Sequence, residues 1–215
     1  MITLAFDTCL DKMYAAIKKD GKILSSRVIE NHDNKYHSAF LISTLQEIIK
    51  ENGLKPQDVD LIATDIGPGS FTGIRACVTV ARVMAQQLNC KAVGVSSLEI
   101  LAACKALPPF IREVSQSDGG FIVALDARKN SAYLYQNGEI KGAVQLDEIQ
   151  EIIKSGKYEV LTDDKLQPLL GGISYQQCEL PIGEAIANLA EQDGRELNWR
   201  KLKPLYIQPP PGIGI

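Results

Sequence analysis

The nine residues Gly-Pro-Gly-Ser-Phe-Thr-Gly-Ile-Arg at positions 67–75 constrain the fold more than any other stretch. An apolar run at residues 61–66 precedes them, and a long helical pattern follows. Glycine adopts positive φ at little cost and lets another backbone approach closely, while proline stiffens a turn. The stretch therefore predicts a tight strand–loop–helix element, with Ser70 and Thr72 as candidate helix caps. Its structural loop consists of Gly67, Gly69, Ser70, Phe71, Thr72 and Gly73.

This loop is not a Walker phosphate loop. The Walker motif has four residues between its glycines followed by Gly-Lys-Ser/Thr, and no lysine lies near positions 67–75. Two interpretations stay open from the residues alone. The loop either closes a strand onto a helix and does nothing more, or it presents N–H groups to an anion or a partner backbone.

Composition describes an ordinary globular protein. A chain of 215 residues allows one large domain or two small ones, and 45% hydrophobic with 23% charged residues is typical of a packed core under a polar surface. The net charge is −3, and neither half offers the basic surplus with which proteins grip RNA phosphates. Binding of RNA by this chain alone is therefore not expected.

The five cysteines are scattered, odd in number and never spaced as C-x-x-C. This pattern predicts reduced thiols, not a disulfide framework or a zinc site. No basic segment precedes the first apolar residues and no apolar run reaches membrane length, so neither a signal peptide nor a membrane span is expected. The sequence thus predicts a soluble, cytoplasmic protein.

Hydrophobic periodicity predicts an α/β chain. Residues 2–8 alternate apolar and polar as in a strand, and residues 13–18 and 22–30 pair around an Asp20-Gly21 turn. The further elements expected are helices at 38–52, 71–89 and 97–107 and strands at 61–66 and 91–95.

Proline- and glycine-rich segments predict two lobes. Pro108-Pro109 and residues 115–120 mark the boundary, so an N-terminal lobe over 1–110 and a smaller C-terminal lobe over 111–215 are expected. The second lobe resembles a reduced repetition of the first. Its expected elements are strands at 121–125 and 132–136, an Asn137-Gly138 turn, helices at 146–154 and 183–192, and a proline-rich tail at 209–214.

The helix at 71–89 carries more apolar surface than a single sheet needs. At 100° per residue, its polar side chains gather in one narrow sector, and Ala76, Val80 and Val83 widen the apolar arc to more than half of the circumference. A helix that covers one sheet usually needs a stripe a little over 100° wide. The surplus is buried either by the second lobe or tail, or by another chain.

The helix at 38–52 has an ordinary core stripe, but it also carries a phenylalanine away from that stripe. The stripe is expected to contain Leu41, Ile42, Leu45, Ile48 and Ile49. Phe40 is expected on the opposite side, exposed beside Thr44. Together with the surplus on the next helix, it would form a patch of interface size.

No active centre is visible in the sequence. The two histidines, His32 and His37, are five residues apart and do not share a helix face as an i, i+4 ligand pair would. No nucleophile, base and orienting acid occur together. The sequence predicts no catalytic residue, no metal site and no cofactor.

Several motifs occur in an order typical of one family. They are Leu4-Ala5-Phe6-Asp7-Thr8, His37-Ser38, the loop at 67–75, the segment 93–99 and Leu125-Asp126-Ala127-Arg128. Over roughly residues 1–135 the chain resembles the TsaB (YeaZ) family of proteins for synthesis of threonylcarbamoyladenosine in tRNA. Pro204-Leu205-Tyr206-Ile207 is similar to the closing motif of that family.

The resemblance implies two RNase H-like lobes of the actin, Hsp70 and sugar-kinase superfamily, the second degenerate. It implies a non-catalytic scaffold that binds and orients a catalytic TsaD subunit for N6-threonylcarbamoyl transfer to adenosine 37. A TsaE-like ATPase would be a further partner, tRNA would be reached only through the complex, and the chain would pair with itself as a homodimer. The partner-binding residues so implied are His37, Phe40, Thr44, Arg75, Ala76, Thr79, Val80, Val83 and Gln87.

Two alternative functions remain open from the sequence. The superfamily suggests an ATP-using enzyme, for which Asp7, Thr8 and Asp126 would be a vestigial nucleotide site. The hairpin at residues 9–12 lacks the glycine of such enzymes, however, and Arg128 stands where their second lobe has a glycine. A peptidase is the other rival, because related sequences have been grouped with glycoproteases, but no metal or nucleophile constellation supports it.

Overall fold

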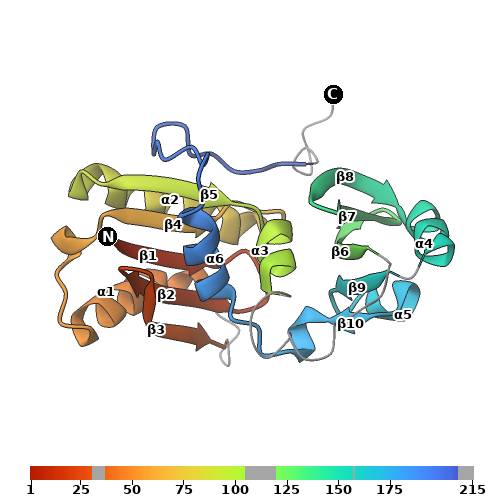
Figure 1. Cartoon of the computed structure of the whole chain (residues 1–215), viewed down its shortest axis with the longest axis horizontal. Coiled ribbons are helices and arrows are strands. Elements are labelled where there is room, and N and C mark those ends of the chain that lie inside the picture. The colour runs from red at the N-terminus through yellow and green to blue at the C-terminus, as the bar shows by residue number, and fades with distance from the viewer. Residues whose placement is uncertain (31–36, 105–119, 157, 208–215) are drawn as a thin grey trace. The chain divides into compact units, whose positions relative to one another are not determined.

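The computed structural model describes residues 1–30, 37–104, 120–156 and 158–207 (Figure 1). The chain forms two compact units. One comprises Met1–Ile100 and Pro181–Leu205, and the other comprises Leu101–Leu180 and Tyr206–Ile215.

The first unit contains a five-stranded mixed sheet in the order β3-β2-β1-β4-β5. The first three strands form an antiparallel meander, and β4 and β5 run parallel to β1. Asp20 and Gly21 both have positive φ, 48° and 83°, as a two-residue hairpin turn requires. The strand bounds are β1 Ile2–Asp7, β2 Met13–Lys19, β3 Lys22–Ile29, β4 Leu61–Asp65 and β5 Lys91–Val95.

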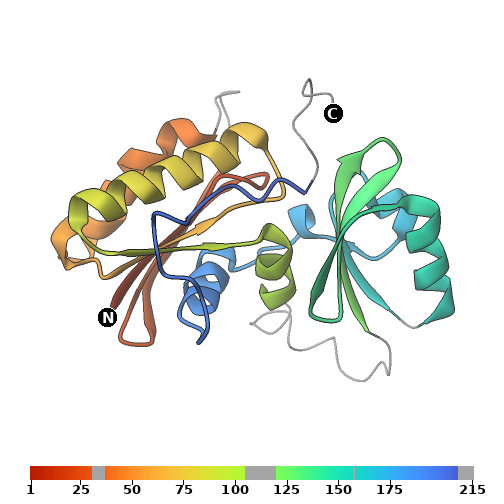
Figure 2. The same cartoon turned by 90° about the horizontal axis from the view of Figure 1, so that it is seen from above.

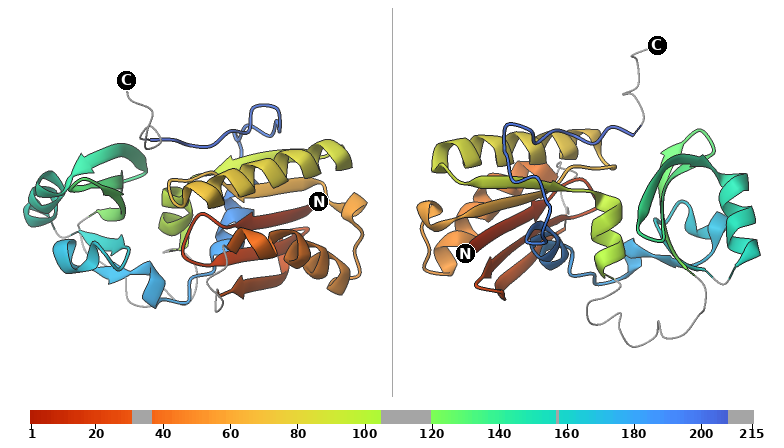
Figure 3. Two further views of the ribbon diagram at one scale, coloured as in Figure 1. Left: turned by 180° about the vertical axis from the view of Figure 1, so that it is seen from behind. Right: turned by 45° about the horizontal axis from the view of Figure 1, so that its top comes forward.

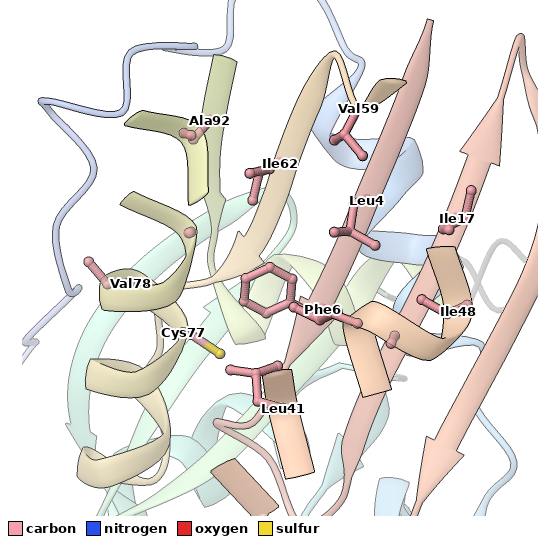
Figure 4. Close-up of a cluster of buried hydrophobic side chains, with 14 of the residues drawn as sticks. Leu4, Phe6, Ile17, Leu41, Ile48, Val59, Ile62, Cys77, Val78 and Ala92 are labelled. Atoms are coloured by element: carbon pink, nitrogen blue, oxygen red, sulfur yellow. The ribbon is translucent and has the colours of Figure 1, made fainter. Parts of the chain in front are cut away.

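Helices cover both faces of this sheet. α1 and α2 lie on one face and α6 on the other (Figures 2 and 3). Because it is covered on both sides, β1 is buried along its whole length. Figure 4 shows the core between the sheet and the first two helices, where Phe6 points among Leu41, Ile48 and Cys77. The helices that lie in this unit are η1 His37–Phe40, α1 Leu41–Glu51, η2 Pro56–Asp58, α2 Phe71–Leu88 and α6 Ile182–Ala190. A further helix, α3 Ser97–Cys104, begins in this unit and ends in the other.

The second unit repeats the same strand order. Its sheet runs β10-β9-β6-β7-β8, so β6 to β10 correspond in turn to β1 to β5. Thr64 donates its hydroxyl to the Phe6 carbonyl at 3.1 Å, and Thr162 donates to the Ala124 carbonyl at 2.8 Å in the equivalent place. The prediction of two RNase H-like lobes is confirmed. The elements are β6 Phe121–Arg128, β7 Ser131–Gln136, β8 Glu139–Gln145, α4 Leu146–Ser155, β9 Glu159–Thr162, α5 Gln167–Leu170, β10 Ile173–Ser174 and η4 Tyr175–Gln177.

The observed division differs from the expected lobes at 1–110 and 111–215. Pro181–Leu205 belongs to the first unit, because α6 packs across β1 and β2. Gly183 permits this close packing, since a Cβ there would lie 3.0 Å from the Ala16 Cβ. The Pro108-Pro109 segment and the proline-rich tail lie outside the described residues.

Two expectations for the first helix are wrong. A 3-10 turn precedes α1, and it places Phe40 half-buried against the core instead of exposed. Thr44 is likewise buried. Ile42, expected in the core stripe, leaves 49% of its surface exposed because it lies at the edge of that stripe. The core side of α1 consists of Leu41, Thr44, Leu45, Ile48 and Ile49.

Two further expectations concern thiols and membranes. All five cysteines are free, and Cys77 is fully buried on the core side of α2, as its helix position predicts. None of the helices in the described ranges combines the length and apolarity that a bilayer crossing requires.

Candidate functional site

The glycine loop packs directly on the turn after β1. A Cβ added at Gly73 would overlap the Thr8 carbonyl group, and one at Gly69 would overlap that of Cys9. The Ser70 N–H donates to the Cys9 carbonyl oxygen at 2.8 Å, and the Thr8 hydroxyl donates to the Gly73 carbonyl oxygen at 3.0 Å. The loop thus closes a strand onto a helix, and the backbone against which it packs belongs to the same chain.

The loop also fixes the start of α2. The Ser70 side chain accepts the Gly73 N–H at 3.3 Å and caps the helix, whereas Thr72 lies exposed in its first turn. Gly67 has a φ of 102°, and its N–H donates to the Asp65 carboxyl at 2.6 Å. The loop residues named from the sequence are therefore brought together at the end of β4.

The vestigial nucleotide residues lie in different units. Asp7 and Thr8 are buried at the end of β1, and Asp126 is at the corresponding end of β6. Asp7 accepts the N–H groups of Cys9 and Leu10 at 2.5 and 3.3 Å. In the first unit, the N–H groups that could cradle a phosphate are therefore bound by a carboxyl group of the protein.

A similar arrangement occurs in the second unit, one residue further along the strand. Asp126 accepts the Arg128 N–H at 2.8 Å and pairs with the Lys165 ammonium at 3.0 Å. Burial acts to raise the pKa of Asp126, but its bonds to Lys165 and to the Arg128 N–H together hold that pKa below its ordinary value. Arg128 also has a positive φ of 63°, a backbone conformation that glycine adopts more readily than other residues.

Three donor groups suggest a metal centre at first sight. One atom each of Asp7, Cys9 and Cys77 lies within 4.8 Å of the others, and all three residues are buried. Protein hydrogen bonds already engage them, however, and Cys77 Sγ accepts the Thr8 N–H at 3.2 Å. Burial, with a hydrogen bond to Cys77, raises the pKa of the Cys9 thiol well above its ordinary value, which disfavours a metal-binding thiolate. This group is a hydrogen-bonded core cluster.

The outward side of α2 gathers most of the expected partner-binding residues. Val83 leaves 53% of its surface exposed, while Ala76 and Val80 are half-buried against the core. Three polar side chains, Arg75, Thr79 and Gln87, are exposed on the same helix. The structure therefore assembles a mixed apolar and polar helix surface in this unit.

Two other expected partner-binding residues do not join this surface. Phe40 packs partly against the core and Thr44 is buried, while the backbone of His37 lies in η1. Two exposed apolar side chains, Ile42 and Phe71, were not predicted from the sequence to lie on a binding surface. Phe71 is 39% exposed and was named only as a residue of the structural loop. A signal for Ile42 was present, since it falls about 100° from Leu41 on a helical wheel, at the margin of the stripe.

Comparisons with known proteins agree with one family. The profile of the family described as TsaD, tRNA N6-adenosine threonylcarbamoyltransferase, matches residues 22–167, more than half of the chain. The tRNA threonylcarbamoyladenosine biosynthesis protein TsaB of Bacillus subtilis (strain 168) is 29% identical over 148 residues, which are 67% of this chain and 60% of that protein. A human tRNA N6-adenosine threonylcarbamoyltransferase is 31% identical over 104 residues, 43% of this chain and 31% of that protein.

A solved structure extends the agreement in fold to nearly the whole chain. YeaZ from Pseudomonas aeruginosa matches with a TM-score of 0.71 at 22% identity, covering 95% of this chain and 99% of that one. The resemblance seen in the sequence motifs therefore rests on a shared fold as well as on shared residues. The chain belongs to the tRNA N6-adenosine threonylcarbamoyltransferase (TsaD) family, and within it to the TsaB (YeaZ) proteins.

Proposed function

We propose that this chain is a non-catalytic subunit in the synthesis of threonylcarbamoyladenosine at position 37 of tRNA, and that it binds and orients a TsaD-like catalytic partner. The observation that carries the proposal is the outward side of α2. Val83 and Phe71 leave apolar surface in solvent on a helix whose opposite side already fills the core. A helix needs only one buried stripe to hold its place on a sheet, so these two exposed apolar side chains are available to another chain.

The charge of α2 indicates what the partner surface carries. The helix has two arginines and no acidic residue. Arg82 is bound to the Leu202 carbonyl oxygen at 3.1 Å, and the Arg75 guanidinium lies 3.9 Å from the centre of the Phe71 ring. A helix with two arginines and no acidic residue favours a partner surface of complementary charge. We expect the partner surface that faces α2 to carry carboxylates.

Light scattering tests the proposal directly. The chain alone is expected to self-associate through the same surface, and addition of a TsaD-like subunit is expected to replace that species with a mixed complex. Shared use of one surface is the physical reason, because the two associations then compete. A mixture that elutes as two separate components would contradict the proposal.

The subunit is proposed to bear no nucleotide site of its own. In support, Asp7 and Asp126 each bind the N–H of the residue two positions on, as described above. The rival ATP-using enzyme would need those N–H groups for phosphate. ATP turnover and the TsaE-like ATPase role are therefore assigned to partners, as is tRNA binding, since the net charge of −3 offers little attraction to phosphates.

Replacing Arg128 by glycine is expected to yield a folded protein without ATPase activity. Glycine adopts the φ of 63° at this position more readily than arginine does, so the fold should be retained. Activity should not appear, because the Cys9 and Leu10 N–H groups in the other unit stay bound to Asp7. Phosphate release measured with and without ATP checks this, and turnover above that of the unmodified chain would favour the enzyme alternative.

A further inference from the structure

Two aspartates end adjacent parallel strands beneath the glycine loop. The register of β1 and β4 pairs Phe6 with Thr64, so the next residues, Asp7 and Asp65, come side by side. Both side chains are fully buried. Two carboxyl groups this close cannot both be ionised cheaply without a cation or water to offset their charges.

The groups around the pair are hydrogen-bond donors and thiols. Asp65 accepts the Gly67 N–H at 2.6 Å and the Ser97 hydroxyl at 2.7 and 2.8 Å, while Asp7 accepts two N–H groups of its own turn. The titratable groups that face the pair are the thiols of Cys9, on the turn, and Cys77, on α2. Within the described ranges, neither aspartate takes part in an ion pair.

The second unit differs, because its aspartates Asp126 and Asp163 are only half-buried and a lysine lies beside them. There Asp163, after β9, accepts the Lys165 N–H at 3.0 Å, just as Asp65 accepts the Gly67 N–H. The Lys165 ammonium then pairs with Asp126, which lies one residue further along its strand than the position that matches Asp7. In the first unit glycine occupies the position of this lysine, because the loop must pass close to neighbouring atoms such as the Ile74 side chain. The first pair is thus left without a counter-ion.

We propose that Asp7 and Asp65 share a single proton, so that an acid–carboxylate hydrogen bond ties β1 to β4 under the glycine loop. Burial raises the pKa of Asp7 to about 6. Burial, with the charge of Asp7, raises the pKa of Asp65 well above its ordinary value of 3.8. The pair as a whole therefore retains a proton to higher pH than isolated carboxyl groups do. The pair is a pH-sensitive latch at the start of α2, and this inference stands apart from the proposed partner.

The sign of the pH dependence follows from these raised values. The unfolded chain releases both protons near pH 3.8, whereas the folded chain retains them to higher pH. The pair therefore contributes stability that is fully present below pH 3.8 and is lost as the pH rises through the folded-state values. The loss begins near pH 4 and continues past about 6, the value for Asp7.

The test is Asp65→Asn. An asparagine oxygen accepts the Gly67 N–H and its amide group donates to Asp7, so the fold is retained while one titration is removed. The melting temperature of the unmodified chain is expected to fall faster above pH 4 than that of the variant. Asp126→Asn is the control, and it should retain the slope of the unmodified chain because its aspartate is paired with Lys165.

Infrared spectroscopy gives a second readout on the unmodified chain. At neutral pH, the infrared spectrum of the unmodified chain is expected to contain the C=O band of a buried protonated carboxyl group. Asp65→Asn should remove this band, and Asp126→Asn should leave it in place. The proposal would be overturned if the melting temperatures of the unmodified chain and of Asp65→Asn fell equally fast as the pH rises above 4. The absence of that band from the unmodified chain at neutral pH would also overturn it, and this measurement does not require the variant to fold.

Discussion

Replacing Val83 by glutamate is expected to weaken binding of the catalytic partner strongly while leaving a folded protein. Val83 is 53% exposed, so the free subunit should change in stability by no more than about 0.5 kcal/mol. In a complex the new carboxylate would be desolvated without a counter-ion. We expect a loss of roughly 2–4 kcal/mol, or roughly 30- to 1,000-fold in affinity, measured by calorimetry or co-elution.

Leu169→Glu is the matched control. Leu169 lies on α5 in the other unit with 52% of its surface exposed, so the chemical change and the exposure are alike. It should leave partner binding unchanged. Val80→Glu is a poorer probe of the interface. Because Val80 packs partly against the core, its replacement would lower the stability of the fold as well as any affinity for the partner. If Val83→Glu still co-elutes with the partner, α2 is not the binding surface.

Replacing Gly73 by alanine is expected to destabilise the first unit by about 3 kcal/mol. The added Cβ would lie 2.7 Å from the Thr8 carbonyl carbon and would overlap its oxygen. Both are backbone atoms, on the turn that follows β1, so relief requires the loop or the strand end to move. Denaturant midpoints at constant slope measure the loss.

Thr72→Ala controls for this substitution one residue away. Thr72 is exposed and Ser70 supplies the cap, so the change should alter stability by no more than about 0.5 kcal/mol. Equal stabilities for Gly73→Ala and Thr72→Ala would show that the loop can retreat from Thr8. The glycine would then serve some purpose other than close approach.

Local chemistry explains why much of the fold could be predicted. The Asp20-Gly21 and Asn137-Gly138 turns both adopt positive φ at their two residues, as hairpin turns of this length require. The predicted α2 at 71–89 matches Phe71–Leu88, because glycines, a capping serine and a long apolar period agree with one another. Such signals act within a few residues and need no partner.

The elements that were not predicted from the sequence lack strong local signals. The strands β8, β9 and β10 of the second unit were not predicted, since β8 is mostly exposed and β10 has only two residues. Phe40 was placed on the wrong side because a 3-10 turn, not an α-helical turn, precedes α1. A small change in residues per turn rotates a side chain from solvent to core.

The sequence by itself determined the class of fold, the strand–loop–helix element at 67–75 and the family, because these depend on local residue patterns read in order. Only the tertiary structure decided which distant residues meet. The structure shows that Pro181–Leu205 packs with the first unit and that Asp7 lies beside Asp65. It also left Val83 in solvent while burying Ala81. Strand order and helix docking set these contacts, because burial depends on what packs against a residue from elsewhere in the chain, which no local pattern specifies.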